Sequence, residues 1–528
     1  MKYVIAGCVV LDGRGTPGQH LDVYVMDGRI SELRPHSDSH AGWDVVAADG
    51  LTVTPGFIDV HSHGDNAPFC SSDDTSKILQ GVTTEVTGNC GFSLAPTTPS
   101  SKPLLADIHP PFRHALSVLT GHNFTSLFAD SARQGYVTNN VPLVGQGALR
   151  MAAMGLESRR PTTREIRTMQ ALLRESIEAG IFGLSTGLIY APGAYTDTTE
   201  LIELASVLTE RHVYASHVRG EGDTLVEAVS EAIEIGFRAG TKVQISHHKA
   251  CGRRNWGKTK ATLKLLESAR AKGLDVHQDA YPYLAGSLLL RECLPAELFE
   301  GGAEHAVRRL EEPEWLATIR DALADKRPGF ENVIGYAGYE GVLISGTQSG
   351  RYVGLTIHEA AIKDGTDEVS FIARLLREEQ MQVVVIAFHI NEADVSRVLS
   401  DRHTVIGSDG DSPDAGGVPH PRTLGTFPRV FAEYVRKQHV LSLEAAVHKM
   451  TGMPARAFGI HDRGTIAVGM AADLVAFDAA AIGDANDYLK PLTPPVGIEW
   501  VAVNGHRVVE KSRYVGPRCG TRVLPRVA

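Results

Sequence analysis

The sequence has 528 residues, several times the length of a typical domain, so it can bury a large core. Hydrophobic residues make up 43% of the chain and charged residues 22%, which excludes a disordered protein. A formal net charge of −10 argues against nucleic-acid binding, and the lack of a run of about 18 apolar residues predicts no membrane span. We therefore expect neither a nucleic acid nor a membrane as partner. Six scattered cysteines do not resemble a disulfide framework and favour a reducing, cytoplasmic location.

Both ends of the chain are predicted to form short strands. Near the N-terminus, Asp27-Gly28 separates two apolar runs and is typical of a hairpin turn, which needs positive φ angles. Near the C-terminus, Asn504-Gly505 gives the same signal. Neither end is long enough for a good core alone. We expect residues 1–54 and 462–528 to form one small β-sandwich domain together, which brings the chain ends close in space.

The middle of the chain, residues 55–461, alternates apolar strands with amphipathic helices. This pattern predicts an α/β fold with a parallel sheet, and its length favours a closed (β/α)8 TIM-like barrel. Nine candidate strands compete for eight places, and the extra one is either the strand near 280 or the strand near 388. The stretch at about 293–350 lacks a clear period and is predicted to be an irregular insertion. The candidate strands end near residues 63, 88, 145, 185, 217, 247, 280, 388 and 409.

Histidines and a carboxylate stand at the ends of several predicted strands. His61 and His63 point to the same side of the first barrel strand, because side chains alternate along a strand, and together they can chelate one ion. His217 and His247 close two later strands, and Asp409 closes the last one. Since barrel enzymes build their sites at the carboxyl ends of the strands, these side chains are expected to meet. Imidazole and carboxylate are ligands of zinc and related ions.

With these candidate metal-ligating residues, the sequence resembles the metal-dependent amidohydrolase superfamily and, within it, the N-acyl-D-amino-acid deacylase (D-aminoacylase) family. The resemblance covers the whole chain, including the divided β domain. It implies zinc-dependent hydrolysis of the amide bond of N-acyl-D-amino acids, small molecules that would be the substrate partner. The matching stretches are Gly81-Val82-Thr83-Thr84, Gly88-Asn89-Cys90-Gly91, Ser246-His247-His248-Lys249, Tyr281-Pro282-Tyr283, Gly407-Ser408-Asp409-Gly410, His420-Pro421-Arg422 and Gly425-Thr426-Phe427-Pro428-Arg429.

The resemblance gives Cys90 a role, because this family uses a cysteine where most of the superfamily has a carboxylated lysine between two metals. A free cysteine is otherwise most often a small buried hydrophobe. The family pattern implies a tighter zinc site made by Cys90, His217 and His247. A second site, weaker or empty, is implied for His61, His63, Cys90 and Asp409, and His248 is expected to be structural.

The family also implies a proton carrier and a set of substrate contacts. Asp409 is expected to take a proton from the attacking water and to pass it to the leaving amine. A free amino-acid carboxylate needs cationic and hydroxyl donors. Arg291, near the insertion, is a further candidate, for a second carboxylate on the substrate. The implied substrate contacts are Tyr190, Lys249, Tyr281, Ser287 and Arg422.

Three departures from the family pattern bear on the substrate rather than on hydrolysis. Gln146 stands between two glycines where the family usually has a histidine, Leu288 follows Ser287 in place of a threonine, and His389 replaces a smaller or apolar residue. Two other functions remain open at this point. A cyclic amidohydrolase of the dihydropyrimidinase or dihydroorotase type usually carries the bridging lysine, so Cys90 argues against it. A non-catalytic assembly protein of the same fold tends to lose ligands that this chain retains.

Overall fold

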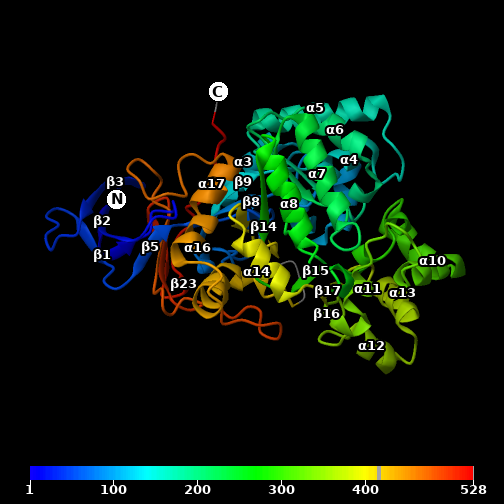
Figure 1. Ribbon diagram of the computed structural model, residues 1–528. Coiled ribbons are helices and arrows are strands. Elements are labelled where there is room, and N and C mark those ends of the chain that lie inside the picture. Colours follow the sequence, from blue (N-terminus) through cyan, green and yellow to red (C-terminus); the bar gives the residue numbers. More distant parts are fainter. Residues whose placement is uncertain (413–417, 527–528) are drawn as a thin grey trace.

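The computed structural model describes residues 1–412 and 418–526. At the left of Figure 1, blue N-terminal strands lie beside orange and red C-terminal strands. They form one sheet, in which β5 of the N-terminal part pairs antiparallel with β20 of the C-terminal part. The small β domain is thus built from both chain ends, as expected. Its strands are β1 (Lys2–Val10), β2 (Gln19–Met26), β3 (Arg29–Pro35), β4 (Asp44–Ala47), β5 (Thr52–Pro55), β20 (Leu474–Phe477), β21 (Ile498–Val503), β22 (His506–Glu510) and β23 (Arg513–Tyr514).

The two predicted hairpin turns are present in this sheet. Asp27 and Gly28 have φ angles of 49° and 80°, and they connect β2 to β3. Asn504 and Gly505, with φ angles of 48° and 84°, connect β21 to β22. Positive φ at both central residues is the geometry that matches the twist of the flanking strands.

Parallel strands form the barrel, and their order follows the sequence. Hydrogen bonding of β7 (Ser62–His63) to β19 (Gly410–Asp411) joins the first strand to the last at the carboxyl end. Counting β9 and β10 as one, the described residues supply eight barrel strands, so the expected barrel is confirmed. They are β6 (Phe57–Asp59), β8 (Val82–Thr87), β9 (Asn139–Pro142), β10 (Val144–Gly145), β11 (Gly183–Gly187), β12 (Val213–His217), β13 (Lys242–Ile245), β14 (Val276–Ala280) and β18 (Thr404–Ile406).

Amphipathic helices cover the outside of the barrel (Figure 1). In α7, Leu225, Ala228, Val229 and Ala232 are buried against the core, whereas Ile233 is only partly buried. The helices outside the insertion are α1 (Ser101–Ile108), α2 (Arg113–Val118), α3 (Phe124–Gln134), α4 (Gln146–Met154), α5 (Thr163–Ala179), α6 (Thr198–Ala205), α7 (Leu225–Ala239), α8 (Thr259–Ala271), α14 (Glu392–Ser400), α15 (Arg422–Arg429), α16 (Leu443–Met450) and α17 (Gly452–Phe458).

The extra candidate strand is the one near 388. This strand, β17 (Val384–Phe388), pairs antiparallel with β15 (Ala285–Leu289) and β16 (Val342–Gly346) in a separate small sheet. The segment at 293–350 contains three α-helices, so the expectation of an irregular stretch is wrong; Leu298, Ile319 and Ile334 belong to an apolar cluster. Its helices are α9 (Ala303–Arg309), α10 (Pro313–Leu323) and α11 (Val333–Ala337), and they are followed in the sequence by α12 (Ile357–Asp364) and α13 (Glu368–Glu378). Figure 1 shows α10 to α13 at the lower right.

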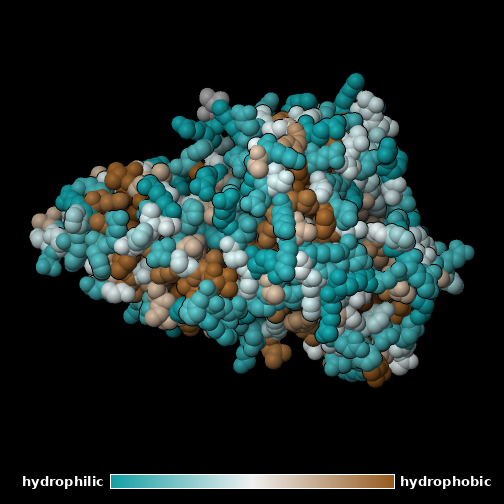
Figure 2. Space-filling model, viewed as in Figure 1, coloured by the Kyte–Doolittle hydropathy of each residue, from teal (hydrophilic) through white to brown (hydrophobic). Residues whose placement is uncertain are grey.

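The face of the molecule in Figure 2 is mostly hydrophilic, with hydrophobic residues in small groups. Among the helices in the described part of the chain, none combines the length and the apolar character that crossing a membrane requires.

Phe57 joins the barrel to the β domain. Its fully buried ring, on β6, lies 5.8 Å from the ring of Phe427 and 6.4 Å from that of Phe477 on β20, measured between centroids. Truncation of a buried phenylalanine leaves a cavity as well as losing apolar burial, so Phe57→Ala should lower the free energy of unfolding by about 3–5 kcal/mol. The urea midpoint and Tm measure this loss.

Phe237→Ala is the matched control, because this phenylalanine is 43% exposed. Its effect should stay below about 1 kcal/mol. Equal losses in the two variants would contradict the role of Phe57 as the contact between the two parts of the core.

Candidate metal centre

The side chains singled out as ligands converge at the carboxyl ends of the barrel strands. Each is held where a strand ends or within three residues of that end, and all of them are buried or nearly so. Strand order therefore brings together residues that are hundreds of positions apart in the sequence. They are His61, His63, Cys90, His217, His247 and Asp409.

Cys90 lies at the centre of this cluster. Its Sγ is 3.2 Å from Nε2 of His61, 3.8 Å from Nδ1 of His217 and 3.7 Å from Nε2 of His247. In a tetrahedral zinc site with usual bond lengths, sulfur and nitrogen ligands stand about 3.6 Å apart. The distances from Cys90 to His217 and His247 are therefore close to those of ligands around one ion.

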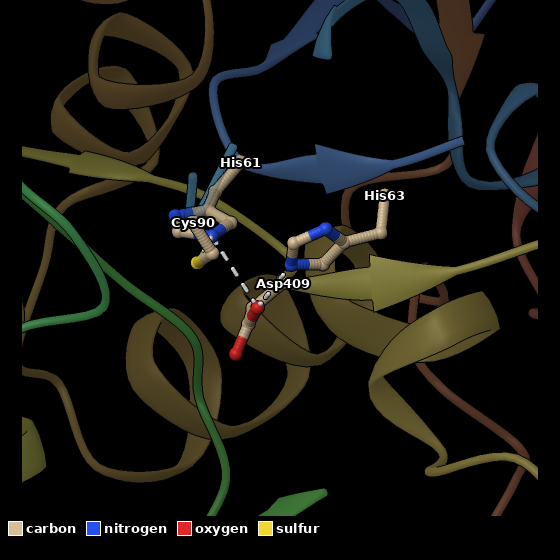
Figure 3. A group of neighbouring side chains, drawn as sticks. All are labelled: His61, His63, Cys90 and Asp409. Atoms are coloured by element: carbon tan, nitrogen blue, oxygen red, sulfur yellow. Dashed lines mark hydrogen bonds and ion pairs between the residues drawn. The ribbon is translucent and has the colours of Figure 1, made fainter. Parts of the chain in front are cut away.

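Asp409 contacts two histidines of the same cluster. Its Oδ1 lies 3.1 Å from Nε2 of His63 and 3.3 Å from Nε2 of His61. Figure 3 shows both imidazoles and this carboxylate pointing toward one another, with the histidines from the first barrel strand and the aspartate from the last.

Two overlapping groups can hold a metal, and Cys90 belongs to both. One consists of Cys90, His217 and His247, and the ligand atoms of each group lie within 4.8 Å of one another. The donor chemistry fits zinc, which accepts thiolate, imidazole and carboxylate. The second group consists of His61, His63, Cys90 and Asp409.

The electrostatics favour the thiolate that a metal requires. Burial opposes ionisation of Cys90, but the charge of His61 and hydrogen bonds from His217 and His247 outweigh burial and hold the thiol pKa well below its usual value. A thiolate is the form of cysteine that ligates metals.

The backbone at three of these residues is in the left-handed region. Cys90, His247 and Asp409 have φ angles of 52°, 35° and 52°. Such values are uncommon for residues other than glycine and cost free energy, and they cluster at functional sites. Each of these turns directs a side chain inward from the end of a strand.

Two buried carboxylates that the sequence analysis missed hold the histidines in position. Asp279 has Oδ1 3.2 Å from Nδ1 of His61 and accepts a hydrogen bond from the backbone N–H of His247 at 2.8 Å. Glu221 has Oε1 2.9 Å from Nδ1 of His247 and accepts a hydrogen bond from Nζ of Lys249 at 2.5 Å. Their position in the sequence was the available signal, because Asp279 is the last residue but one of a strand and Glu221 follows His217 by four residues.

Arg422 is paired with Asp409. Its Nη1 lies 2.7 Å from Oδ2 of the aspartate, and its Nη2 donates to the backbone oxygen of Ser287 at 3.4 Å. Burial alone would raise the pKa of Asp409, but Arg422, His247 and His61 hold it well below the usual range. Asp409 is therefore a carboxylate at neutral pH.

A cavity of about 260 Å³ opens from the cluster and brings all five candidate substrate contacts together. The Tyr281 ring lies between two cations, 5.5 Å from Nζ of Lys249 and 5.0 Å from the guanidinium of Arg422. Its buried hydroxyl has no hydrogen-bond partner among the described residues, which leaves it to a ligand. The five are Tyr190, Lys249, Tyr281, Ser287 and Arg422.

Arg291 does not line the cavity, so its candidacy for a substrate carboxylate is wrong. Only 4% of this residue is exposed, and its guanidinium donates to the backbone oxygens of Asp107, at 2.9 Å, and Ile108. Arg291 instead anchors the loop that carries His109 and Pro110 into the wall of the cavity.

Three other noted residues have distinct places. His248 points away from the cluster and lies 2.7 Å from the Thr262 hydroxyl, a structural contact. Gln146 donates to the hydroxyl of Thr196 at 2.9 Å and lies outside the cavity, whereas His389 lines it.

Comparison with known proteins agrees with this geometry. The sequence pattern of the amidohydrolase family matches residues 44–509. A D-aminoacylase of Alcaligenes xylosoxydans xylosoxydans is 37% identical, over 99% of this chain and 98% of its own length. An N-acyl-D-glutamate deacylase from the same organism is also 37% identical, over 96% of this chain and 93% of its own.

A solved structure extends the similarity to the whole fold. The N-acyl-D-glutamate deacylase of Bordetella bronchiseptica, in complex with zinc and a phosphonate that mimics the tetrahedral intermediate, superposes with a TM-score of 0.83. It is 32% identical and covers 100% of both chains. This chain belongs to the amidohydrolase family.

Proposed function

We propose that this protein hydrolyses the amide bond of N-acyl-D-amino acids, releasing a free D-amino acid and a carboxylic acid. The observation that carries the proposal is one cavity in which the Cys90 cluster faces Lys249 and Arg422. The cluster suits amide hydrolysis, and the cations suit a substrate with a free carboxylate. The D configuration is supported by the relatives named above.

Zinc is the cofactor we propose. Cys90, His217 and His247 would hold it in a tighter site, and His61, His63, Cys90 and Asp409 in a weaker or empty second one. Zinc at this position supplies a Lewis acid for the amide carbonyl and lowers the pKa of water from about 15.7 toward about 7.

Asp409 carries the proton in this proposal. Its carboxylate faces the cavity beside both histidines of the first strand. Its low pKa keeps it ionised at neutral pH, which is the form that can accept a proton from the attacking water. The same group then donates that proton to the leaving nitrogen, which departs as an amine.

The substrate carboxylate would be bound by the two cations and the hydroxyl of Tyr281. Contacts to Asp409 and Ser287 leave further N–H donors on Arg422 free for a ligand. The Tyr190 hydroxyl donates to the backbone oxygen of Cys90 at 3.0 Å, which places its ring against the cluster, and Ser287 completes the wall.

A hydrolysis screen tests the proposed function. The panel contains N-acetyl and N-formyl derivatives of D- and L-amino acids, the α-amide of the best substrate, and simple hydantoins. We expect D-acyl derivatives to be used best and the α-amide poorly, because the amide lacks the carboxylate. Preference for hydantoins would support the cyclic amidohydrolase, and no hydrolysis with near-zero metal content would support the assembly protein.

Two substitutions separate metal binding from proton transfer. Cys90→Ala removes the thiolate common to both sites, so tightly bound zinc and activity should fall together. Asp409→Asn keeps the shape of the side chain but cannot accept the proton, so turnover should fall by about 10²–10⁴-fold while zinc in the tighter site remains. Elemental analysis and kcat measure the two effects.

Cys293→Ala is the matched control for the cysteine, because Cys293 is buried in the apolar cluster of the insertion. It should keep both zinc and activity. If Asp409→Asn loses zinc as fully as Cys90→Ala, Asp409 is a principal ligand; if it retains more than about a tenth of the activity, the proton has another carrier.

Arg422→Ala should weaken substrate use without loss of zinc. A charge-assisted contact contributes about 1.5–3 kcal/mol, so kcat/KM should fall by about ten- to a hundredfold. Arg429→Ala is the control, since Arg429 ends the same helix and pairs with Asp484 instead. Unchanged kinetics in Arg422→Ala would remove this residue from the site.

Glu221→Gln should affect metal and substrate together, because one carboxylate oxygen contacts both His247 and Lys249. Loss of a carboxylate that orients a ligand histidine typically lowers metal affinity by about 10–100-fold. Chelator competition measures zinc affinity, and KM reports the displaced lysine. Glu227→Gln, at an exposed position of α7, should change neither quantity; a normal zinc affinity in Glu221→Gln would refute the positioning role.

A further inference from the structure

The cavity continues beyond the cluster and the two cations into a part that we call the outer pocket. The neutral polar side chains of Thr347, Gln348 and Gln382 line the same cavity, and we define the outer pocket by Phe92, Pro110, Ile189, Leu288, Leu289 and Glu292. Most of these side chains are apolar, and the exception is an acid. In a substrate bound by its amide and its α-carboxylate, the acyl group and the amino-acid side chain are the parts left to occupy this space.

The positive charges of the cavity are already paired. Among the described residues that line it, Lys249 and Arg422 are the only lysine or arginine side chains. Lys249 contacts Glu221 at 2.5 Å, and Arg422 contacts Asp409 at 2.7 Å. Under the proposed function, both also serve the α-carboxylate, so a second carboxylate on the substrate finds no cation of its own.

Two further carboxyl groups, those of Glu292 and Asp411, also line the cavity. Neither forms an ion pair with any lysine, arginine or histidine that the structure describes. Glu292 accepts a hydrogen bond from the backbone N–H of Leu289 at 3.0 Å. Burial raises the pKa of Glu292 to about 7 against the effect of Arg291, and Asp411 adds to the increase. This region therefore already disfavours one negative charge.

Two other basic side chains, those of Arg291 and His109, supply no free positive charge to the outer pocket. The guanidinium of Arg291 donates hydrogen bonds to backbone oxygens outside the cavity. His109 packs between aromatic rings, 4.9 Å from that of Phe92 and 4.3 Å from that of Phe112, where the charged form of an imidazole is disfavoured.

We propose that the outer pocket selects substrates in which both the acyl group and the amino-acid side chain are uncharged, and that Glu292 excludes acidic side chains. The proposal rests on the proposed function and narrows its substrate class. The two named relatives, a D-aminoacylase and an N-acyl-D-glutamate deacylase, are equally similar to this chain, so their identities do not make this choice.

A comparison of matched substrates on the zinc-loaded protein tests this. We would measure kcat/KM for the N-acetyl derivatives of D-leucine, D-lysine, D-aspartate and D-glutamate, and for N-succinyl-D-leucine, whose acyl group is acidic. The leucine derivative should exceed every acidic substrate by about 100-fold or more, since each acid would leave a carboxylate unpaired in a desolvated pocket.

Glu292→Gln identifies the group responsible. The amide can still accept the hydrogen bond from Leu289. At a pH above the Glu292 pKa of about 7, where the carboxyl is ionised, we expect the ratio of D-glutamate to D-leucine activity to rise by about tenfold, since one repulsive charge is gone. Glu297→Gln is the control, because Glu297 pairs with Arg327 outside the cavity, and it should leave the ratio unchanged.

The outcomes are distinct. Equal or better use of an acidic or basic derivative than of N-acetyl-D-leucine would overturn this inference and leave the proposed function intact. An unchanged ratio in Glu292→Gln would overturn the role of that residue. Failure to hydrolyse any of the derivatives would reject the proposed function and this inference with it.

Discussion

The convergence of one thiol, four imidazoles and one carboxylate on a single buried point is the constraint on which the rest of the structure depends. Polar groups that repel one another and lose their hydration are costly to bury together unless the protein holds each of them with hydrogen bonds or ion pairs. Positive φ angles at Cys90, His247 and Asp409 turn these side chains inward. Asp279, which touches both His61 and His247, then ties the first barrel strand to a later one. The strained backbone at these three residues and the buried carboxylate of Asp279 therefore hold the candidate metal ligands together.

The same constraint couples the cluster to the cations of the cavity. Glu221 contacts His247 on one side and Lys249 on the other, and Asp409 contacts His63 and pairs with Arg422. Each cation is therefore held by a carboxylate that also touches a proposed ligand. A displacement of the cluster would move the cations that we propose to bind the substrate, so the proposed metal binding and carboxylate recognition would depend on each other.

The sequence predicted the features that depend on local pattern. Strand alternation placed His61 and His63 on one side of a strand, and strand-end position grouped them with His217, His247 and Asp409. The role of Cys90 required the family resemblance, because nothing local distinguishes it from another buried cysteine such as Cys293. Turn chemistry likewise predicted the hairpins of the β domain.

The features that the sequence did not predict depend on contacts between distant segments. An apolar run such as β17 has the same composition in a barrel as in a small antiparallel sheet, and only its partners, β15 and β16, decide between them. Arg291 is similar, because its direction is set by the backbone oxygens of Asp107 and Ile108, far away in sequence. The roles of Asp279 and Glu221 also appear only when strand order brings them beside the histidines.

The candidate ligands and much of the outer pocket are held by different parts of the fold. The ligands come from barrel strands, whose register is fixed by pairing along the whole sheet, so their positions cannot change singly. Much of the outer pocket comes instead from β15, from Glu292 just after it and from the loop held by Arg291. Because β15 belongs to a separate sheet that packs on the apolar cluster of the insertion, its side chains can change without altering the pairing of the barrel strands. A substitution on β15 that alters the proposed outer pocket therefore need not displace the candidate metal ligands or the carboxylates beside them.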